Sequence, residues 1–346
     1  MISTRKLAAM AGVSQSTVSR SLRNHPAISR ETREKIAALA SENGYNPRLP
    51  STSKKRVRKR KAIALIMTGM SYTNLYLESV FNRVFKEIER STYLALLAHD
   101  KVDMVSYDRV RDLSVSGIVA GFIISSLHFN PRVHEYLTAQ KIPHVYLHYF
   151  GKDSLEALNI VDTDNYLGGH IAAQHLLALR HRRIKMLTSD SASDALDSHT
   201  FHDRTTGFLA AMRSASVAIT PEDITLVPDH NFRNAYGYVT ANIPHIRNYS
   251  AIFAQTDTMA MGCINALQDN GIAVPGDISV MGYDGIEEGV LCRPNVTTVR
   301  QPIEELAEET LTRLMNLMEN PAQTARRCFI QPTLLLRQST RHYGDQ

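Results

Sequence analysis

The chain has 346 residues, 43% of them hydrophobic and 21% charged, which is the composition of an ordinary globular protein with two or three domains. No apolar run reaches the roughly 18 to 20 residues that a membrane span needs, and the polar N-terminus shows no secretory signal. Cys263, Cys292 and Cys328 fit neither a disulfide framework nor a metal finger, which favours a reducing cytoplasm.

The charge is divided unequally along the chain. Residues 1–61 hold 15 Lys and Arg but three acidic residues, a net charge of +12. Since the whole chain carries +5, residues 62–346 carry −7. A basic head on an acidic body indicates a polyanionic partner at one end of the chain only.

Residues 1–46 are predicted to form a small module of three helices. Gly12 can end the first helix in a left-handed conformation, and Ser14 is a suitable N-cap for the second. A third helix is expected from about residue 30 to residue 43. The apolar positions that recur at helical spacing are Leu7, Ala8, Ala11, Val18, Leu22, Ile36, Leu39 and Ala40.

The outward face of the second helix is polar and lacks acidic residues. It consists of Gln15, Ser16, Thr17, Ser19 and Arg20. Amide, hydroxyl and guanidinium groups on an exposed helix suit the base edges of a DNA major groove. The alternative is an ordinary surface helix hairpin, against which the following basic tract argues.

Residues 47–61 form a basic connector, in which seven of the eight residues from Lys54 to Lys61 are Lys or Arg. Such a tract can be a solvated linker or an arm that follows DNA phosphates. We expect both, a segment that is flexible when free and ordered on DNA.

From Ala62 onward, apolar strands alternate with amphipathic helices. The run 63–67 is entirely apolar, as expected of a strand buried on both faces. Further strands are predicted at 93–97, 117–124, 144–147, 184–187, 251–254 and 278–283, and helices at 77–88, from 165, at 204–212 and at 259–269. The repeated pattern predicts two α/β lobes, each a parallel sheet flanked by helices, with a cleft between them.

Ligands of open parallel α/β sheets bind beyond the carboxyl ends of strands. The polar and aromatic residues placed there are Thr68, Tyr76, Arg204, Phe232, Thr256, Asp257 and Asp284. A guanidinium, carboxylates, hydroxyls and an aromatic ring are what a sugar or nucleoside-like ligand needs. Arg204 is expected to open a helix and Phe232 to lie in a polar loop, whereas Asp257 could equally cap the following helix.

Enzyme readings are disfavoured, because the chain has no Gly-x-Ser-x-Gly, Gly-x-Gly-x-x-Gly, phosphate-binding or His-Glu-x-x-His motif. The fourteen histidines include the near pairs His144 with His148 and His199 with His202. Lone histidines are usually surface or core residues, so we expect no catalytic residue, no metal and no cofactor.

Residues 11–20, Ala-Gly-Val-Ser-Gln-Ser-Thr-Val-Ser-Arg, resemble the helix-turn-helix signature of the lactose-repressor (LacI/GalR) family. Further segments that are similar to the family are 28–33, 44–47, 253–262, 274–280 and 296–302. The resemblance implies an N-terminal all-α helix-turn-helix DNA-binding domain (1–46), a hinge (47–61) and a two-lobed body like periplasmic binding proteins (62–346).

The resemblance also assigns residues to roles. It implies base reading by Gln15, Ser16 and Arg20, with Thr17 and Ser19 nearer the phosphates. We also expect phosphate contacts by Thr4 and Ser14, and by Lys54, Lys55, Arg56 and Arg58 of the basic connector. In the cleft it implies effector contacts by Arg204, Phe232, Asp284 and Gln301.

The chain departs from the family at three positions. Pro50 lies inside the stretch where members have a hinge helix, and Lys54 stands roughly where their minor-groove leucine is expected. Thr256 stands where many members have a ligand-contacting asparagine.

The resemblance implies three crossings between lobes, with a first lobe of about 62–160 and 296–322 and a second of 161–295 and 323–346. The implied function is a cytoplasmic, homodimeric transcriptional regulator, a repressor of an operator in double-stranded DNA, controlled by a sugar or related metabolite. Two alternatives remain: a regulator controlled by a partner protein, and a solute-binding module.

Overall fold

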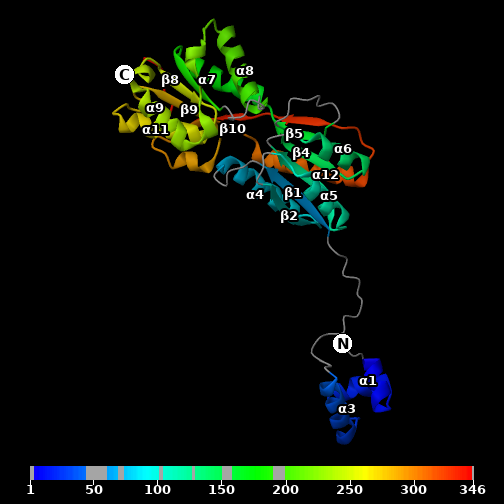
Figure 1. Cartoon of the computed structure of the whole chain (residues 1–346). Coiled ribbons are helices and arrows are strands. Elements are labelled where there is room, and N and C mark those ends of the chain that lie inside the picture. The colour runs from blue at the N-terminus through cyan, green and yellow to red at the C-terminus, as the bar shows by residue number, and fades with distance from the viewer. Residues whose placement is uncertain are drawn as a thin grey trace. The chain divides into compact units, whose positions relative to one another are not determined.

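The computed structural model describes residues 4–43, 61–68, 74–100, 104–126, 129–149, 158–189 and 199–344 (Figure 1). They belong to two compact units, Met1–Lys59 and Arg60–Gln346. The predictions made for Pro50, Lys54, Lys55, Arg56 and Arg58 lie outside the described residues. In the part of the chain that is described, no helix is long and apolar enough to cross a membrane.

The first unit contains the three predicted helices, α1 (Thr4–Ala11), α2 (Gln15–Leu22) and α3 (Arg30–Glu42). Gly12 has a φ of +70° and turns the chain between α1 and α2. The Ser14 hydroxyl accepts the backbone N–H of Thr17 at 3.1 Å, which confirms the predicted N-cap. The core is small and consists of Leu7, Ala8, Ala11, Val18, Ile36 and Ala40, with Val13, Leu22 and Leu39 packed against it.

The second unit contains two six-stranded sheets, each at the centre of one lobe (Figure 1). The sheet of the first lobe has the order β11-β5-β4-β3-β1-β2, and all its strands are parallel. Its strands are β1 (Ala62–Thr68), β2 (Leu94–Asp100), β3 (Val119–Ser126), β4 (His144–Tyr149), β5 (Ile160–Thr163) and β11 (Arg327–Ile330).

Helices cover both faces of this sheet. They are α4 (Leu75–Glu89), α5 (Tyr107–Val115), α6 (Pro131–Ala139) and α12 (Ile303–Glu319). Ile63 and Leu65 of β1 pack in the cluster with α4 and α12, whereas Ala64 and Ile66 pack in the cluster with α5 and α6. A strand buried on both faces needs an unbroken apolar run, which explains residues 63–67.

The sheet of the second lobe has the order β12-β10-β9-β8-β6-β7. All of these strands run parallel except β12, which pairs antiparallel with β10. The strands are β6 (Ile184–Thr188), β7 (Ile224–Leu226), β8 (Ala251–Ala254), β9 (Ser279–Asp284), β10 (Thr297–Arg300) and β12 (Thr333–Leu335). The helices are α7 (Asn165–Ala178), α8 (His199–Ser214), α9 (Phe232–Ala241), α10 (Ile243–Ile246) and α11 (Asp257–Asp269), with short 3₁₀ turns at Pro221–Asp223, Pro228–His230 and Glu287–Val290.

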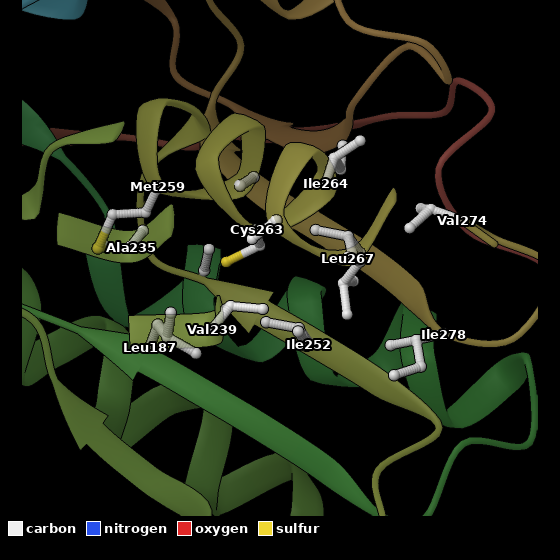
Figure 2. Packing of buried hydrophobic residues seen from close by; sticks show 14 of the residues in the cluster. Leu187, Ala235, Val239, Ile252, Met259, Cys263, Ile264, Leu267, Val274 and Ile278 are labelled. Atoms are coloured by element: carbon white, nitrogen blue, oxygen red, sulfur yellow. The ribbon is translucent and has the colours of Figure 1, made fainter. Parts of the chain in front are cut away.

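Figure 2 shows the larger core of the second lobe, between α11 and the sheet. Met259, Cys263 and Leu267 of α11 recur at helical spacing and are fully buried. They pack in one cluster with Ile252 of β8 and Leu187 of β6. Burial raises the pKa of the Cys263 thiol to about 12, so this cysteine acts as a core residue.

The structure moves two of the expected lobe boundaries. β10 was expected in the first lobe, but it pairs with β9 in the second, and the chain crosses after it at Gln301. β11 was expected in the second lobe, but it pairs with β5 in the first. Both strands have four residues, and the partner of so short a strand is decided by backbone pairing that the sequence does not display.

Two placements near the cleft are also corrected. α8 begins at His199, so Arg204 lies in its second turn and does not open the helix. Phe232 is the first residue of α9, capped by Asn231, and does not lie in a loop. The sequence around Phe232 is polar, and α9 has only two buried residues, Ala235 and Val239. The helical periodicity of apolar residues was therefore too weak to predict this helix.

Candidate DNA-reading helix and interlobe site

The exposed face of α2 presents the predicted polar side chains. Gln15, Ser16 and Arg20 are exposed, whereas Thr17 and Ser19 are half-buried. The Gln15 amide donates to the Thr4 hydroxyl at 2.9 Å, which ties the start of α2 to α1. Its amide oxygen stays available as an acceptor, so Gln15 can offer a base an acceptor without breaking this bond.

Ser14 is already engaged within the module. Its hydroxyl caps α2 and lies 2.7 Å from the Ser16 hydroxyl and 2.9 Å from the Thr17 hydroxyl. This cluster of hydroxyls lies at the N-terminus of α2, where the helix dipole favours an anion such as a phosphate.

In the second unit, polar side chains from both lobes meet in a buried network beyond the carboxyl ends of the strands. Tyr76 of α4 donates its hydroxyl proton to Gln301 Oε1 at 2.8 Å. Gln301 follows β10, and its Nε2 donates to Asp284 Oδ1 of β9 at 2.8 Å. Thr163, at the end of β5, donates its hydroxyl to the same Gln301 oxygen at 2.7 Å. Gln301 therefore links a helix of the first lobe to a strand of the second.

Arg204 reaches this network from α8 and is 3% exposed. Its Nε donates to Asn165 Oδ1 at 2.9 Å, and its Nη1 donates to the Gln255 carbonyl at 2.7 Å. Its guanidinium lies 3.7 Å from the centre of the Tyr283 ring and 3.9 Å from Asp284 Oδ1. A guanidinium held on three sides is a fixed donor and positive charge in the site.

Asp284 occupies an unusual environment. Its φ is +123°, a strained conformation for a residue other than glycine, and such strain gathers at functional sites. Burial raises the pKa of its carboxyl group to about 6, while Arg204 and the hydrogen bond from Gln301 act in the opposite direction. Arg204 and Gln301 therefore favour the ionised form of Asp284 against the effect of burial.

The sequence did not point to His148 and Asp162 as site residues, yet both join the network. His148 Nδ1 lies 2.9 Å from Asp162 Oδ1, and His148 Nε2 lies 3.2 Å from the Tyr76 hydroxyl. Both residues are buried and lie near the carboxyl ends of β4 and β5. Ligands bind beyond the carboxyl ends of parallel strands, so both residues would have been candidates if the sequence had shown β5 and had extended β4 beyond Leu147.

Two of the predicted effector residues serve the protein itself. Thr256 caps α11, because its hydroxyl accepts the backbone N–H of Met259 at 3.1 Å. Asp257 is fully buried and accepts the backbone N–H groups of Gly285 and Ile286 at 2.8 and 2.9 Å. Asp257 thus fixes the loop after β9.

Phe232 and Thr68 are placed differently. Phe232 is 38% exposed at the start of α9 and stacks on Tyr236, with ring centres 6.1 Å apart. An exposed ring of this kind is free to cover a ligand. Thr68 is the last residue of β1, and its side chain lies outside what the structure describes.

A small pocket in the first lobe borders the network. It is lined by Val105, Ile124, Ser126, Phe129, Asn130, Val133, Tyr146 and His148. His148 is thus shared between this pocket and the network. Among the described residues, no group of three or more Cys, His, Asp or Glu could hold a metal ion.

Both parts of the chain are similar to known proteins. Residues 173–340 match the family described as periplasmic binding protein-like domain. The ribose operon repressor of Haemophilus influenzae is 27% identical over 342 residues, which cover 98% of each protein. Residues 5–48 match the family described as bacterial regulatory proteins, lacI family. The chain belongs to the LacI family.

Two solved structures share the fold of this LacI-family chain. The complex of the transcriptional regulator CelR with cellobiose has a TM-score of 0.70 at 22% identity, covering 98% of this chain and 100% of that one. The Lac repressor dimer bound to operator and the anti-inducer ONPF has a TM-score of 0.67 at 20% identity, covering 98% and 99%. As a LacI-family member, the protein is a DNA-binding transcriptional regulator and not an enzyme.

Proposed function

We propose that this LacI-family protein is a cytoplasmic repressor whose DNA binding is controlled by an uncharged, hydroxyl-rich ligand between the lobes. The observation that carries the proposal is the buried network in which Gln301 joins Tyr76 of one lobe to Asp284 of the other. A ligand that bonds these groups acts on both lobes at once, so it can favour one of two lobe arrangements.

The charges of the network favour a neutral ligand. Arg204 faces the Asp284 carboxylate, and a second buried carboxylate, Asp162, joins the same network beside His148. Two of the Arg204 N–H groups already donate to protein oxygens. A phosphate would meet these carboxylates, and like charges in a buried site repel strongly. Hydroxyl groups can bond both to carboxylates and to guanidinium, and the exposed ring of Phe232 suits the apolar face of a sugar.

In the first unit we propose base reading by Gln15, Ser16 and Arg20, the exposed side chains of α2. Thr4, Ser14, Thr17 and Ser19 surround them and are assigned to phosphates, together with the basic connector. One such unit reads a short site, so two copies on a near-palindromic operator are expected.

The body offers a surface for pairing two copies. β2 is an edge strand of the first lobe, and Leu94 and Leu97 on it are 47% and 50% exposed. Apolar side chains on an open sheet edge favour contact with a second copy. Sedimentation at increasing concentration tests this: replacing both leucines by lysine should give monomers, and an unchanged dimer would place the contact elsewhere.

Control by a partner protein is the second candidate, since the Thr256 hydroxyl caps α11 at the position where many family members have a ligand-contacting asparagine. Melting shifts with ribose, cellobiose and nucleosides, each compared with its phosphate, decide between the two. We expect a shift with an uncharged compound and none with its phosphate. Failure of every compound would favour the partner protein, and a shift with phosphates alone would contradict the charge argument.

A further inference from the structure

The amide of Gln301 gives the interlobe network a direction. Its nitrogen can only donate and its oxygen can only accept. The nitrogen faces Asp284 Oδ1, and the oxygen faces the hydroxyls of Tyr76 and Thr163. The Arg204 guanidinium, 3.9 Å from the same Asp284 oxygen, favours an ionised carboxylate there. An ionised carboxylate requires the amide nitrogen, so this orientation is fixed.

The single hydroxyl proton of Tyr76 is therefore committed to Gln301. Burial, with Asp284 and Asp162 nearby, raises the pKa of Tyr76 well above its usual value, so the hydroxyl keeps its proton. The Tyr76 oxygen also lies 3.2 Å from His148 Nε2. When Tyr76 donates to Gln301 it can only accept from the side of His148, and Nε2 then carries a hydrogen.

The other ring nitrogen of His148 also faces an acceptor. Nδ1 lies 2.9 Å from Asp162 Oδ1, which accepts the backbone N–H of Thr163 at 2.7 Å as well. A carboxylate oxygen accepts hydrogen bonds, so Nδ1 must carry a hydrogen too. An imidazole with hydrogens on both nitrogens is positively charged.

We propose that His148 is a positioning residue of the ligand site, held as an imidazolium between Asp162 and Tyr76, where it directs the Tyr76 hydroxyl toward Gln301. The inference rests on the proposed function in taking the interlobe network as the place where the ligand binds. It adds a proton to the site, and with it a dependence of ligand binding on pH.

The groups that face His148 agree with a positive charge. Asp162 comes from β5, Tyr76 from α4 and Asp284 from β9, and the guanidinium of Arg204 lies beyond Asp284. Among the described residues, Tyr283 lies on β9 with Asp284, and His144 and Tyr146 lie on β4 with His148. Burial and the neighbouring Asp284 raise the pKa of the third buried carboxyl group, Asp257, which favours its neutral form. With the imidazolium, two positive groups then stand with the carboxylates of Asp162 and Asp284.

The backbone is distorted to place this ring. His148 has a φ of +57°, and the pairing of β3 with β4 shifts between Ile124 and Ser126, opposite this part of β4. Left-handed backbone and bulges are costly in a strand and are found where a side chain must be aimed. His148 is 4% exposed and also lines the small pocket of the first lobe.

The same hydrogen bonds permit one competing placement of the extra proton. If Asp284 were protonated and the Gln301 amide reversed, Tyr76 would donate to a neutral His148. Arg204 disfavours this placement because it stabilises an ionised Asp284, and Asp162 disfavours it because it stabilises a charged His148. Without an extra proton, Tyr76 would turn to His148 and leave Gln301 Oε1 with Thr163 alone.

The test is the protonation state of His148 in the full, ligand-free protein, read by NMR of histidine labelled with ¹⁵N. The H148N variant identifies its signals. At about pH 7, the wild type should show two protonated ring nitrogens. A neutral His148, or a protonated Asp284 beside it, would overturn the assignment.

Three variants test the cause. The Y76F variant removes the acceptor that faces His148 Nε2, and the D162N variant removes the negative charge beside Nδ1 while leaving an amide oxygen that can still accept. Each variant should therefore show a neutral His148 where the wild type shows two protonated ring nitrogens. Y283F is the matched control, because that buried hydroxyl donates to Asn165 and not to His148. Unchanged signals in both Y76F and D162N would contradict the proposal, and if one of the two fails to fold the other decides.

The pH profile of binding separates this inference from the proposed function. With ribose and cellobiose as probes, the affinity of the wild type should depend on pH, and this dependence should vanish in H148N. If NMR shows two protonated ring nitrogens on His148 but neither probe binds, the proposed ligand class is wrong and the assignment of the imidazolium is kept. If a probe binds the wild type with no pH slope, the positioning role is wrong.

Discussion

Arg204 shows at the scale of one residue how the site and the stability of the second lobe depend on the same side chain. Arg204 donates to the buried oxygens of the Asn165 side chain and the Gln255 carbonyl. If Arg204 is replaced, both oxygens lose this donor. The guanidinium also faces Asp284 across 3.9 Å. A buried arginine with three oxygen neighbours serves both packing and recognition.

Arg204→Met should abolish the ligand-dependent change in DNA binding while leaving DNA binding itself. The variant keeps the side chain's length. The buried Gln255 carbonyl loses its Arg204 donor, which should cost about 1–3 kcal/mol, whereas Asn165 Oδ1 keeps the hydrogen bond from the Tyr283 hydroxyl. Operator binding with and without ligand, together with urea denaturation, measures both effects. A normal ligand response would remove Arg204 from the site.

Arg20→Ala should weaken binding to the preferred operator by about 1–3 kcal/mol and relax the choice of base at one position. Arg20 is exposed in the last turn of α2. Arg30→Ala is the matched control, because this exposed arginine of α3 is paired with Glu34. An equal loss on every DNA sequence would make Arg20 a phosphate contact.

His144 should make the protein sensitive to acid. Burial lowers the pKa of His144 from 6.5 to about 4. Between pH 6.5 and pH 4, His144 is therefore protonated in the unfolded chain and neutral in the folded protein. Stability therefore falls as pH drops from 6.5 to 4, by a total on the order of 3 kcal/mol. His144→Gln should make this fall shallower in urea denaturation, with the part due to other buried histidines such as His175 remaining, whereas replacing the exposed His202 should leave it unchanged. An equally steep fall in H144Q would assign the acid sensitivity to other groups.

Sequence reasoning at this scale found the residues whose type is distinctive. Arg204, Asp284, Tyr76 and Gln301 meet in one network, as predicted from strand ends and from the family resemblance. Thr256 and Asp257 could not be separated from caps, because a hydroxyl or carboxylate at a helix start suits either role. His148 and Asp162 were missed because they become neighbours only when β4 and β5 pair.

At the scale of elements, α7 and α8 pack closely enough to exclude side chains at two positions. A Cβ on Gly169 would lie 1.9 Å from the Arg204 carbonyl oxygen, and a Cβ on Gly207 would lie 1.9 Å from that of Tyr166. The close approach of these backbones sets the position of α8, and with it that of Arg204.

Gly207→Ala should therefore push α8 away and destabilise the protein by about 1–3 kcal/mol, because the clash is with backbone. Ligand affinity should fall with stability, since Arg204 moves. Gly237→Ala in α9 is the control: no atom lies within 4 Å of the added Cβ, so it should be neutral or stabilising. Equal stability of the two variants would show that α7 and α8 adjust freely.

The long elements were predictable and the short ones were not. Helices such as α4 and α11 and the apolar strand β1 show clear periodicity over many residues. β10 and β11 have four residues each, and their partners are set by long-range pairing. This is why two lobe boundaries were misplaced although both lobes were recognised.

At the scale of the whole molecule, the charge division predicts strongly salt-dependent DNA binding. Replacing the seven basic residues between Lys54 and Lys61 with glutamine should flatten the plot of log affinity against log salt concentration, since fewer counterions are released. Affinity at low salt should fall on all DNA sequences alike. An unchanged slope would mean that this tract does not contact the duplex.

The central claim is that the basic head reads DNA and the acidic two-lobed body controls it. The most direct test is binding of the purified full-length protein to promoter fragments of its own genome at low salt, with competitor DNA, with and without small-molecule extract of its cells. We predict selection of a near-palindromic site and a change in affinity when extract is added. Binding no tighter than to competitor DNA, under both conditions, would contradict the claim.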